Sequence, residues 1–203
     1  MIGLSESLGR TSELVSKRII VAITGASGAT YGLRLLQVLK ELNVETHGIV
    51  TSSGATNLKI ETSLVKDDVL NLCTYRYDEN GVGARLASGS YITDGMAIVP
   101  CSTRTLAGVA HGLSDNLVLR TADVCLKEKR RLVLVPRETP LSVIHLRNMI
   151  SAAEAGAVLL PAMPAFYHQP KTIKDLVDQV VGKVLDILRI EHSLYQRWTG
   201  TTT

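Results

Sequence analysis

Apolar runs and amphipathic segments alternate along almost the whole chain. Short runs rich in Val, Ile and Leu, typical of buried strands, occupy residues 18–24, 45–53, 95–100, 131–136 and 157–161. Segments with apolar residues at helical spacing occupy residues 30–42, 63–72, 101–112, 117–130, 141–156 and 172–188. Regular alternation of strand and helix predicts an α/β fold, a Rossmann-like doubly wound parallel sheet in a flavodoxin-like three-layer arrangement.

The same pattern predicts one domain with two short flanks. We expect an irregular or short helical lead-in at 1–17, the domain at 18–198 and a tail at 199–203. The stretch YRYDENGVGARLASGSY (75–91) is rich in Gly, Ser and charged residues and predicts a loop. A loop of this length in a compact domain is usually functional or mobile.

Composition narrows the possible partners. The 203 residues carry a formal charge of +3 with no long basic run, which argues against a nucleic-acid partner. No apolar signal region and no apolar stretch of membrane-spanning length is evident, so we expect a cytoplasmic protein with no membrane partner. The three cysteines form no C-x-x-C pair, which argues against a disulfide framework and against a metal site.

Polar residues collect where the predicted strands end. Ligands of such folds bind at the carboxyl ends of the strands. Small, hydroxyl or charged residues dominate four of the five ends, at 25–27, 51–53, 100–103 and 136–138. This concentration is the strongest indication of a site that the residues give by themselves.

The first of these ends, TGASGATYG (24–32), is a glycine-rich turn that indicates a phosphate site. Its spacing differs from the dinucleotide pattern G-x-G-x-x-G, and Ser27 adds a hydroxyl. Glu45 has the sequence spacing of a ribose-binding acid, but it begins the second strand, whereas Thr51 and its neighbouring serines end it. FMN therefore fits better than NAD, and a plain strand-to-helix turn is the alternative.

The segment PCSTRT (100–105) ends the next long strand. Ser102, Thr103 and Thr105 are residues that cap helices, and Arg104 adds positive charge. Ordinary capping would explain one of these hydroxyls, whereas three together suggest a ligand. Cys101 has no base near it in the sequence, so we expect a buried, inert thiol.

Three further positions are candidates for chemistry. Arg120 lies among apolar residues of a predicted helix and could bind an anion. Glu138, next to Arg137, could act as an acid or base, or the two could form a surface ion pair; the spacing does not separate these alternatives. In AFYHQP (165–170), Tyr167 could donate to a phosphate, while His168 fits better as part of an aromatic plug over the core.

These motifs together resemble one family. The segments TGASGATYGLRLL, PCSTRTLAGVAHG, RTADVCLKEKRRLVLVPRETPL, HLRNM and GAVLLPAMPAFYHQP are similar to those of the flavin prenyltransferases of the UbiX type. The resemblance implies a Rossmann-like domain in a homododecamer, without a metal. It further implies transfer of a dimethylallyl group from dimethylallyl phosphate to N5 and C6 of reduced FMN. The product, prenylated FMN, would serve UbiD-type decarboxylases.

The resemblance also implies roles for single residues. Those matched to FMN are Gly25, Ala26, Ser27, Thr51, Cys101, Ser102, Thr103, Arg104 and Arg120, and those matched to the prenyl phosphate are Lys127, Arg137, Glu138, Tyr167 and Lys183. Glu138, Lys127 and Tyr167 are the implied catalytic residues. Thr51 stands where the family usually has serine. Lys183 stands where arginine is more frequent, and lysine lacks the bidentate fork for a phosphate.

Two other functions fit the same fold. A flavin-dependent decarboxylase of the related cysteine-decarboxylase group would carry a PASANT-type segment in place of PCSTRT. It would also carry a catalytic histidine in the region of NLKIETSL (57–64), which has none. A non-enzymatic flavin-binding subunit would have no need of Glu138, Tyr167 and the two lysines.

Overall fold

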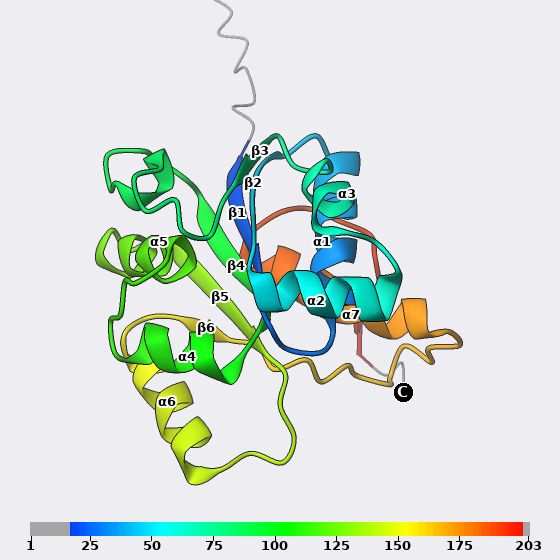
Figure 1. The fold of residues 1–203 in the computed structure, drawn as a ribbon. Helices are drawn as coiled ribbons and strands as arrows, with labels where there is room; N and C mark the ends of the chain where they lie inside the picture. The colour runs from blue at the N-terminus through cyan, green and yellow to red at the C-terminus, as the bar shows by residue number, and fades with distance from the viewer. Residues whose placement is uncertain (1–16, 201–203) are drawn as a thin grey trace, which may run out of the picture.

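A parallel six-stranded sheet forms the centre of the molecule (Figure 1). The computed structural model describes residues 17–200, so nearly all of the predicted lead-in and the last residues of the tail lie outside the described part. The strand order is β3-β2-β1-β4-β5-β6. The strands are β1 (Arg18–Ile23), β2 (Glu45–Val50), β3 (Tyr75–Tyr77), β4 (Gly95–Cys101), β5 (Arg131–Pro136) and β6 (Val158–Leu159).

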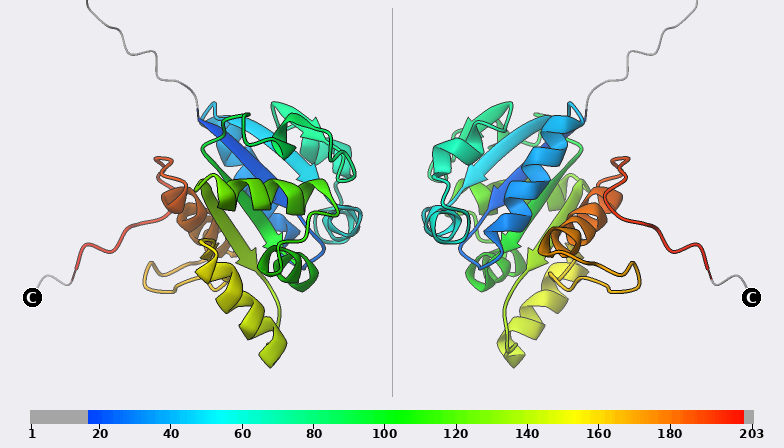
Figure 2. Two further views of the ribbon diagram at one scale, coloured as in Figure 1. Left: turned by 90° about the vertical axis from the view of Figure 1, so that its left-hand side faces the viewer. Right: turned by 90° about the vertical axis from the view of Figure 1, so that its right-hand side faces the viewer.

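Helices cover both faces of this sheet, which gives the predicted three layers (Figures 1 and 2). One face carries α1 (Ala29–Glu41), α2 (Ser52–Thr62), α3 (Lys66–Leu70) and α7 (Ile173–Ile187). The other carries α4 (Thr103–Ala110) and α5 (Leu117–Lys127), with the 3-10 turn η1 (Arg85–Ala87) beside them. The remaining helix, α6 (Val143–Glu154), extends beyond α4 at the edge of the molecule (Figure 1).

The central strands are apolar on both sides because both sides are covered. Ile19, Val21 and Ile23 belong to the core under α1 and α7, whereas Ile20 and Ala22 belong to the core under α4 and α5. Side chains alternate between the faces of a strand, so a continuous apolar run fills two cores at once. Gly32 lets α1 approach the sheet, since a Cβ there would lie 2.3 Å from the Val99 carbonyl oxygen.

The predicted doubly wound fold is confirmed, with two corrections. Residues 75–77, predicted as loop, form the edge strand β3, which pairs with β2 through His47 and Tyr75. Ser52 and Ser53, predicted to end the second strand, begin α2 instead. Among the helices of residues 17–200, none is long and apolar enough to cross a membrane.

The order of the strands determines where the sheet can bind a ligand. β1 pairs with both β2 and β4, and the chain leaves β1 toward one edge of the sheet and later returns to extend the other. The carboxyl ends of β1 and β4 therefore form the point where the order reverses, which is where open α/β sheets bind ligands. The loop after β1 and the segment PCSTRT meet there, as expected from the sequence.

Candidate functional site

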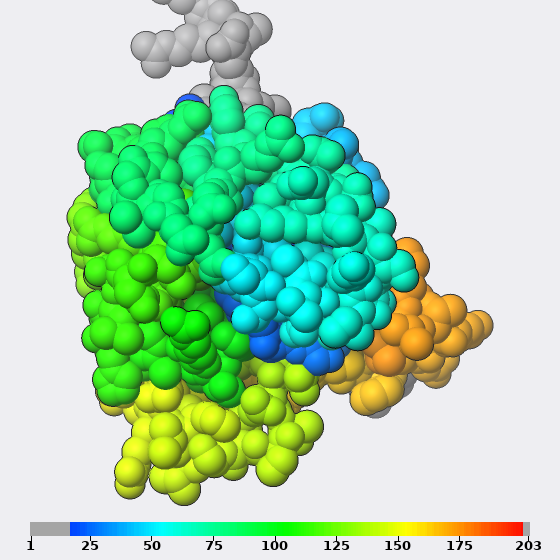
Figure 3. Space-filling model, in the orientation of Figure 1, coloured from blue at the N-terminus to red at the C-terminus, as the bar shows by residue number. Residues whose placement is uncertain are grey.

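A cavity of about 460 Å³ lies at the carboxyl ends of β1, β2 and β4. We call it the switch-point cavity; it is lined by Thr24, Gly25, Thr51, Ser52, Ser53, Glu79, Asn80, Ser102, Thr103, Arg104, Thr105, Asp115, Asn116 and Leu119. In the space-filling view the first loop, in blue, is visible between α2 in cyan and α4 in green (Figure 3). Hydroxyl and amide groups dominate this lining.

Three helices begin at the switch-point cavity. The Thr51 hydroxyl caps α2 by accepting from the Gly54 amide at 3.1 Å. Ser102 caps α4 by accepting from the Thr105 amide at 3.2 Å, and Asn116 caps α5 by accepting from the Leu119 amide at 2.9 Å. A helix N-terminus carries partial positive charge, and three of them around one cavity favour a negatively charged ligand.

Thr24 holds the two central strand ends together. Its hydroxyl donates to the Pro100 carbonyl oxygen at 2.8 Å and accepts from the Ser102 amide at 2.8 Å. The side chain is buried, so these bonds are shielded from water. Sequence reasoning missed this residue, although a hydroxyl at the last position of a buried apolar run was a visible signal.

Contacts with α2 hold the first loop in place. Gly25 packs against α2, where an added Cβ would lie 2.5 Å from the Cβ of Ser53. Gly28 caps α1 at a φ of 98°, which favours glycine. The amides of Gly28 and Ala29, at the start of α1, are already occupied, because the Glu61 carboxylate accepts from both at 2.7 to 3.0 Å.

Two carboxylates that the sequence analysis did not single out also line the switch-point cavity. Glu79 accepts from the Ser52 amide at 2.6 Å and from the Ser52 hydroxyl. Its carbonyl oxygen accepts from the Leu117 amide, at the start of α5, at 2.7 Å. Asp115 also lines the cavity, just before α5. The long loop after β3 thus supplies a wall of the site.

Arg137 and Glu138 follow β5 and lie beside the switch-point cavity. The Arg137 Nε donates to the Ser27 carbonyl oxygen at 3.2 Å, which joins the β5 end to the first loop. Glu138 is exposed and accepts from the Thr139 amide at 3.0 Å. Both line a smaller cavity of about 230 Å³ with apolar neighbours that include Met149 and Met163. An exposed carboxyl beside apolar side chains suits proton transfer in a site that excludes water.

Arg120 and Lys127 both lie on α5, and neither lines the switch-point cavity. Arg120 binds the Asp123 carboxylate at 2.8 Å and the Ala87 carbonyl oxygen at 3.2 Å, and it is not among the residues that line the switch-point cavity. Lys127, at the far end of α5, pairs with Glu128 at 2.5 Å. β5, six residues and about 20 Å long, runs between Lys127 and Glu138 in the chain, and Lys127 does not line the cavity that contains Glu138. One chain therefore does not bring the predicted catalytic residues together.

Tyr167 and Lys183 have neighbours on the C-terminal segment and at the end of α7. The Tyr167 ring meets the Trp198 ring edge-on at 5.9 Å, and Lys183 Nζ lies 3.7 Å from the Asp186 carboxylate. Asp186 also accepts from the Tyr195 hydroxyl at 2.6 Å, so the C-terminal segment is fastened over α7. Although burial acts in the opposite direction, hydrogen bonds from Arg197, Tyr195 and His192 lower the pKa of Asp186 to about 2.

The AFYHQP segment does not cover the core as an aromatic plug, because Phe166 and Tyr167 are 69% and 46% exposed. Both ring nitrogens of His168 are buried without a hydrogen-bond partner among residues 17–200. The ring lies edge-on to Tyr167 at 5.7 Å. This environment is consistent with the packing role preferred for His168.

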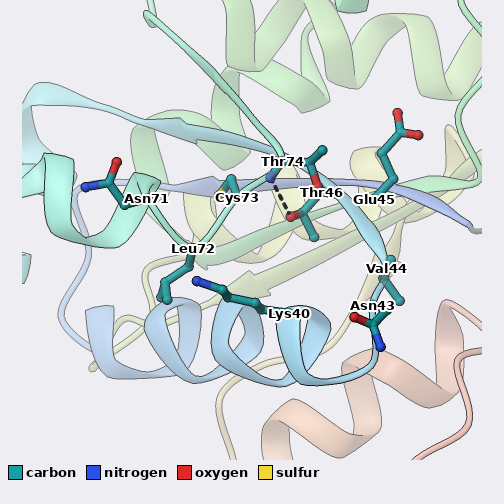
Figure 4. A pocket seen from close by; sticks show the side chains of 9 residues that line it. All are labelled: Lys40, Asn43, Val44, Glu45, Thr46, Asn71, Leu72, Cys73 and Thr74. Atoms are coloured by element: carbon teal, nitrogen blue, oxygen red, sulfur yellow. Dashed lines mark hydrogen bonds between the residues drawn. The ribbon is translucent and has the colours of Figure 1, made fainter.

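The thiols are unreactive in this environment. Burial raises the pKa of Cys101 to about 12, as expected for an inert side chain. A cavity of about 400 Å³ at the opposite edge of the sheet contains Cys73, whose pKa burial also raises to about 12 (Figure 4). Its other polar lining includes Thr46 and Thr74, which bond to each other's backbone amides. This second cavity thus offers neither a nucleophile nor a helix N-terminus of the kind found at the switch point.

No group of three or more His, Cys, Asp or Glu in the described part of the chain could hold a metal ion. The polar side chains of the switch-point cavity are mostly hydroxyls and amides, which donate to anions. Its donors therefore favour a phosphate-bearing ligand.

Sequence comparison gives close relatives over nearly the full length. The Flavoprotein family model matches residues 8–197. The flavin prenyltransferase UbiX of Thauera aromatica is 50% identical over 183 residues, which cover 90% of this chain and 94% of the relative. The flavin prenyltransferase UbiX of Salmonella typhimurium is 49% identical over 187 residues, which cover 91% of this chain and 99% of the relative.

Solved structures give the same similarity. AnUbiX in complex with FMN and dimethylallyl pyrophosphate superposes with a TM-score of 0.90 at 48% identity, covering 92% of this chain and all of that one. A dodecameric FMN-dependent UbiX-like decarboxylase from Escherichia coli O157:H7 gives 0.88 at 47% identity, covering 90% and 100%. The cysteine decarboxylase SpaF, at 15% identity and a TM-score of 0.58, shares the fold alone.

Proposed function

Because the chain belongs to the flavin prenyltransferase family, the UbiX family, we propose that it transfers a dimethylallyl group from dimethylallyl phosphate to N5 and C6 of reduced FMN. The observation that carries this proposal is the switch-point cavity, where three helix N-termini and a set of hydroxyls converge. The reaction makes the protein a transferase, and its product is prenylated FMN.

The switch-point cavity fits FMN in size and in chemistry. A volume of about 460 Å³ lies within the usual range of small-molecule sites. Gly25, Thr51, Ser102, Thr103 and Arg104, all expected to bind FMN, line it. Of the other expected FMN residues, Ala26 and Ser27 follow Gly25 in the first loop and Cys101 precedes Ser102 at the end of β4, whereas Arg120 has other partners.

The arginine of the FMN site is better assigned to Arg137 than to Arg120. Arg137 reaches the first loop through the Ser27 carbonyl oxygen, whereas Arg120 is held by Asp123 and Ala87. Neither arginine lines the switch-point cavity, but Arg137 is joined to the first loop, whose Gly25 does. We therefore propose Arg137 as the arginine that contacts FMN.

The prenyl phosphate would lie among residues of more than one subunit. Lys127, Glu138 and the pair Tyr167–Lys183 occupy three separate places on one chain. Copies of the chain must therefore combine to surround one substrate. This requirement supports a homododecamer, the assembly described for the relative from Escherichia coli.

Exposed apolar side chains support the same assembly. On α6, Val143, Leu146 and Ile150 form one stripe at helical spacing and are 46% to 61% exposed. Met163, Phe166 and Trp198 add further exposed apolar surface on the loop after β6 and on the C-terminal segment, and the smaller cavity that contains Glu138 includes Met163. Large apolar patches of this kind mark protein interfaces.

The residues supply the chemistry that the transfer needs. When the carbon–oxygen bond of dimethylallyl phosphate breaks, its electron pair stays on the phosphate. Lys127, Lys183 and Tyr167 would stabilise the negative charge that develops there, and Glu138 would donate a proton to the phosphate. The apolar neighbours of Glu138 would keep water away from the allylic carbon.

One measurement tests the reaction. The protein is incubated without oxygen with reduced FMN and either dimethylallyl phosphate or dimethylallyl pyrophosphate, and the flavin mass is then determined. We expect the mass of prenylated FMN with the monophosphate. An unchanged flavin with both donors would contradict the transferase and favour a decarboxylase or a non-enzymatic flavin-binding subunit.

Mixed oligomers test the sharing of the site. Lys127→Ala and Glu138→Gln would each be inactive alone. If a site takes these residues from different subunits, random co-assembly restores both native residues in roughly a quarter of the sites. If both come from one subunit, every site keeps a defect and no activity returns.

The destination of the product is also a proposal. We propose that prenylated FMN passes to a UbiD-type decarboxylase, since a modified flavin that leaves its site must be used by another protein. We also propose a cytoplasmic location; a relative from Saccharomyces cerevisiae at 50% identity is described as mitochondrial. Co-purification with a UbiD-type decarboxylase, and fractionation of the cells that make the protein, would test these two points.

A further inference from the structure

Glu79 has no part in the reaction described above, yet it occupies the best anion-binding donors of the switch-point cavity. Its carboxylate accepts from the amide of Ser52 at 2.6 Å and from the hydroxyl of the same residue. Ser52 is the first residue of α2, so this carboxylate lies at the positive end of the helix. A phosphate would be attracted to the same donors for the same reasons.

The backbone fixes Glu79 at this place. The Asp78 side chain accepts from the Asn80 amide at 2.9 Å and the Asp78 carbonyl oxygen accepts from the Gly81 amide at 3.1 Å, which forms a tight turn with Glu79 in its middle. The Glu79 carbonyl oxygen also accepts from the Leu117 amide at 2.7 Å. The main chain is thus anchored to α5, while the side chain is held by Ser52 alone among the hydrogen bonds of residues 17–200.

We infer that Glu79 is a specificity-determining residue that competes with the phosphate end of the flavin for the Ser52 donors. This inference rests on the proposed function, because it takes the flavin of that reaction as the ligand. A carboxylate and a phosphate repel each other at one set of donors, so Glu79 must withdraw when FMN binds. The chain therefore binds FMN less tightly than its three helix N-termini would allow, and it releases a phosphorylated flavin more readily.

The experiment compares FMN with riboflavin, which lacks the phosphate. Glu79→Gln keeps an oxygen that can accept from Ser52 but removes the charge, so the fold should be preserved. We expect FMN to bind about tenfold more tightly to this variant and riboflavin to change by less than about twofold. Flavin fluorescence quenching gives both affinities without any turnover.

Asp115→Asn is the matched control, since Asp115 lines the same cavity with the same charge. If FMN bound equally more tightly to Asp115→Asn, the inference would be overturned. Removing any negative charge from the cavity would then explain the result of both variants. Unchanged FMN binding by Glu79→Gln would also overturn the inference. Weaker FMN binding would overturn it too, because Glu79 would then be a ligand of the flavin. A wild-type chain that binds neither flavin would contradict the proposed function itself.

Discussion

The flavin half and the prenyl-phosphate half of the site are built in different ways. The switch-point cavity is made by strand ends and helix caps that lie close together in one chain, with Thr24 joining β1 to β4. Lys127, Glu138 and Tyr167 belong to three different segments and are all exposed. The comparison fits the proposal that one folded chain suffices to bind the flavin, whereas catalysis needs the assembly.

The largest expected effect is a loss of prenyl transfer that leaves flavin binding intact. Glu138→Gln should slow prenyl transfer by about 10²-fold or more, because it removes a proton donor from the phosphate. FMN affinity should remain within about twofold, since Glu138 lies outside the switch-point cavity. Single-turnover mass spectrometry and flavin titration measure the two quantities. Unaltered turnover would remove Glu138 from the mechanism.

Breaking the assembly should have the next largest effect. Ile150→Asp places a charge on the exposed apolar stripe of α6, where the wild-type side chain is 58% exposed. We expect smaller particles by light scattering and at least about a tenfold loss of activity, with FMN binding retained. Lys129→Asn, on an exposed turn after α5, lowers the charge by the same one unit away from this stripe and is the control. Full activity in a dissociated variant would place the whole site in one chain.

The flavin half should be sensitive to its helix caps. Ser102→Ala removes the side chain that accepts from the Thr105 amide at the start of α4. We expect FMN affinity to fall by about tenfold and the free energy of unfolding to fall by about 1 kcal/mol. Thr62→Ala, at the far end of α2, is a hydroxyl control away from the cavity. Equal loss of FMN binding in both variants would argue against a role for the cap.

The C-terminal segment should show a pH-dependent effect on stability. Hydrogen bonds lower the pKa of Asp186 to about 2, below an unfolded value of about 3.9. Its stabilisation is therefore complete above the unfolded value and is lost as the pH falls toward about 2. Asp186→Asn should unfold about 1 kcal/mol more easily at pH 7, and the gap from wild type should close in acid. Denaturant titrations at several pH values check this.

Sequence predicted the elements whose apolar pattern is strong. β5 was predicted with its observed limits, and the central strands were found because both faces are buried. β3 was missed because Tyr75 and Arg76 are exposed, and its pairing comes from β2 rather than from local pattern. α2 was missed because it buries only Gly54 and Leu58, too few for a helical period.

The site was predictable where the signal was local. The hydroxyls at 51, 102, 103 and 105 are adjacent to strand ends, so the flavin half followed from the order of elements. Lys127 and Glu138 are eleven positions apart in the sequence, but β5 runs between them, and only the fold reveals the distance. Glu61 and Glu79 could not be found in advance, because each acts on a helix that begins far from it in the chain.

The carboxylate of Glu61 on the amides of Gly28 and Ala29 gives the first loop a support of its own. In a protein that binds its flavin permanently, contacts with the flavin can hold such a loop in its conformation. A protein that hands over its flavin after every reaction must fold the same way before the next molecule arrives. The Glu61 carboxylate supports the loop without a bound flavin. This suits an enzyme that releases its flavin as a product rather than one that retains it as a cofactor.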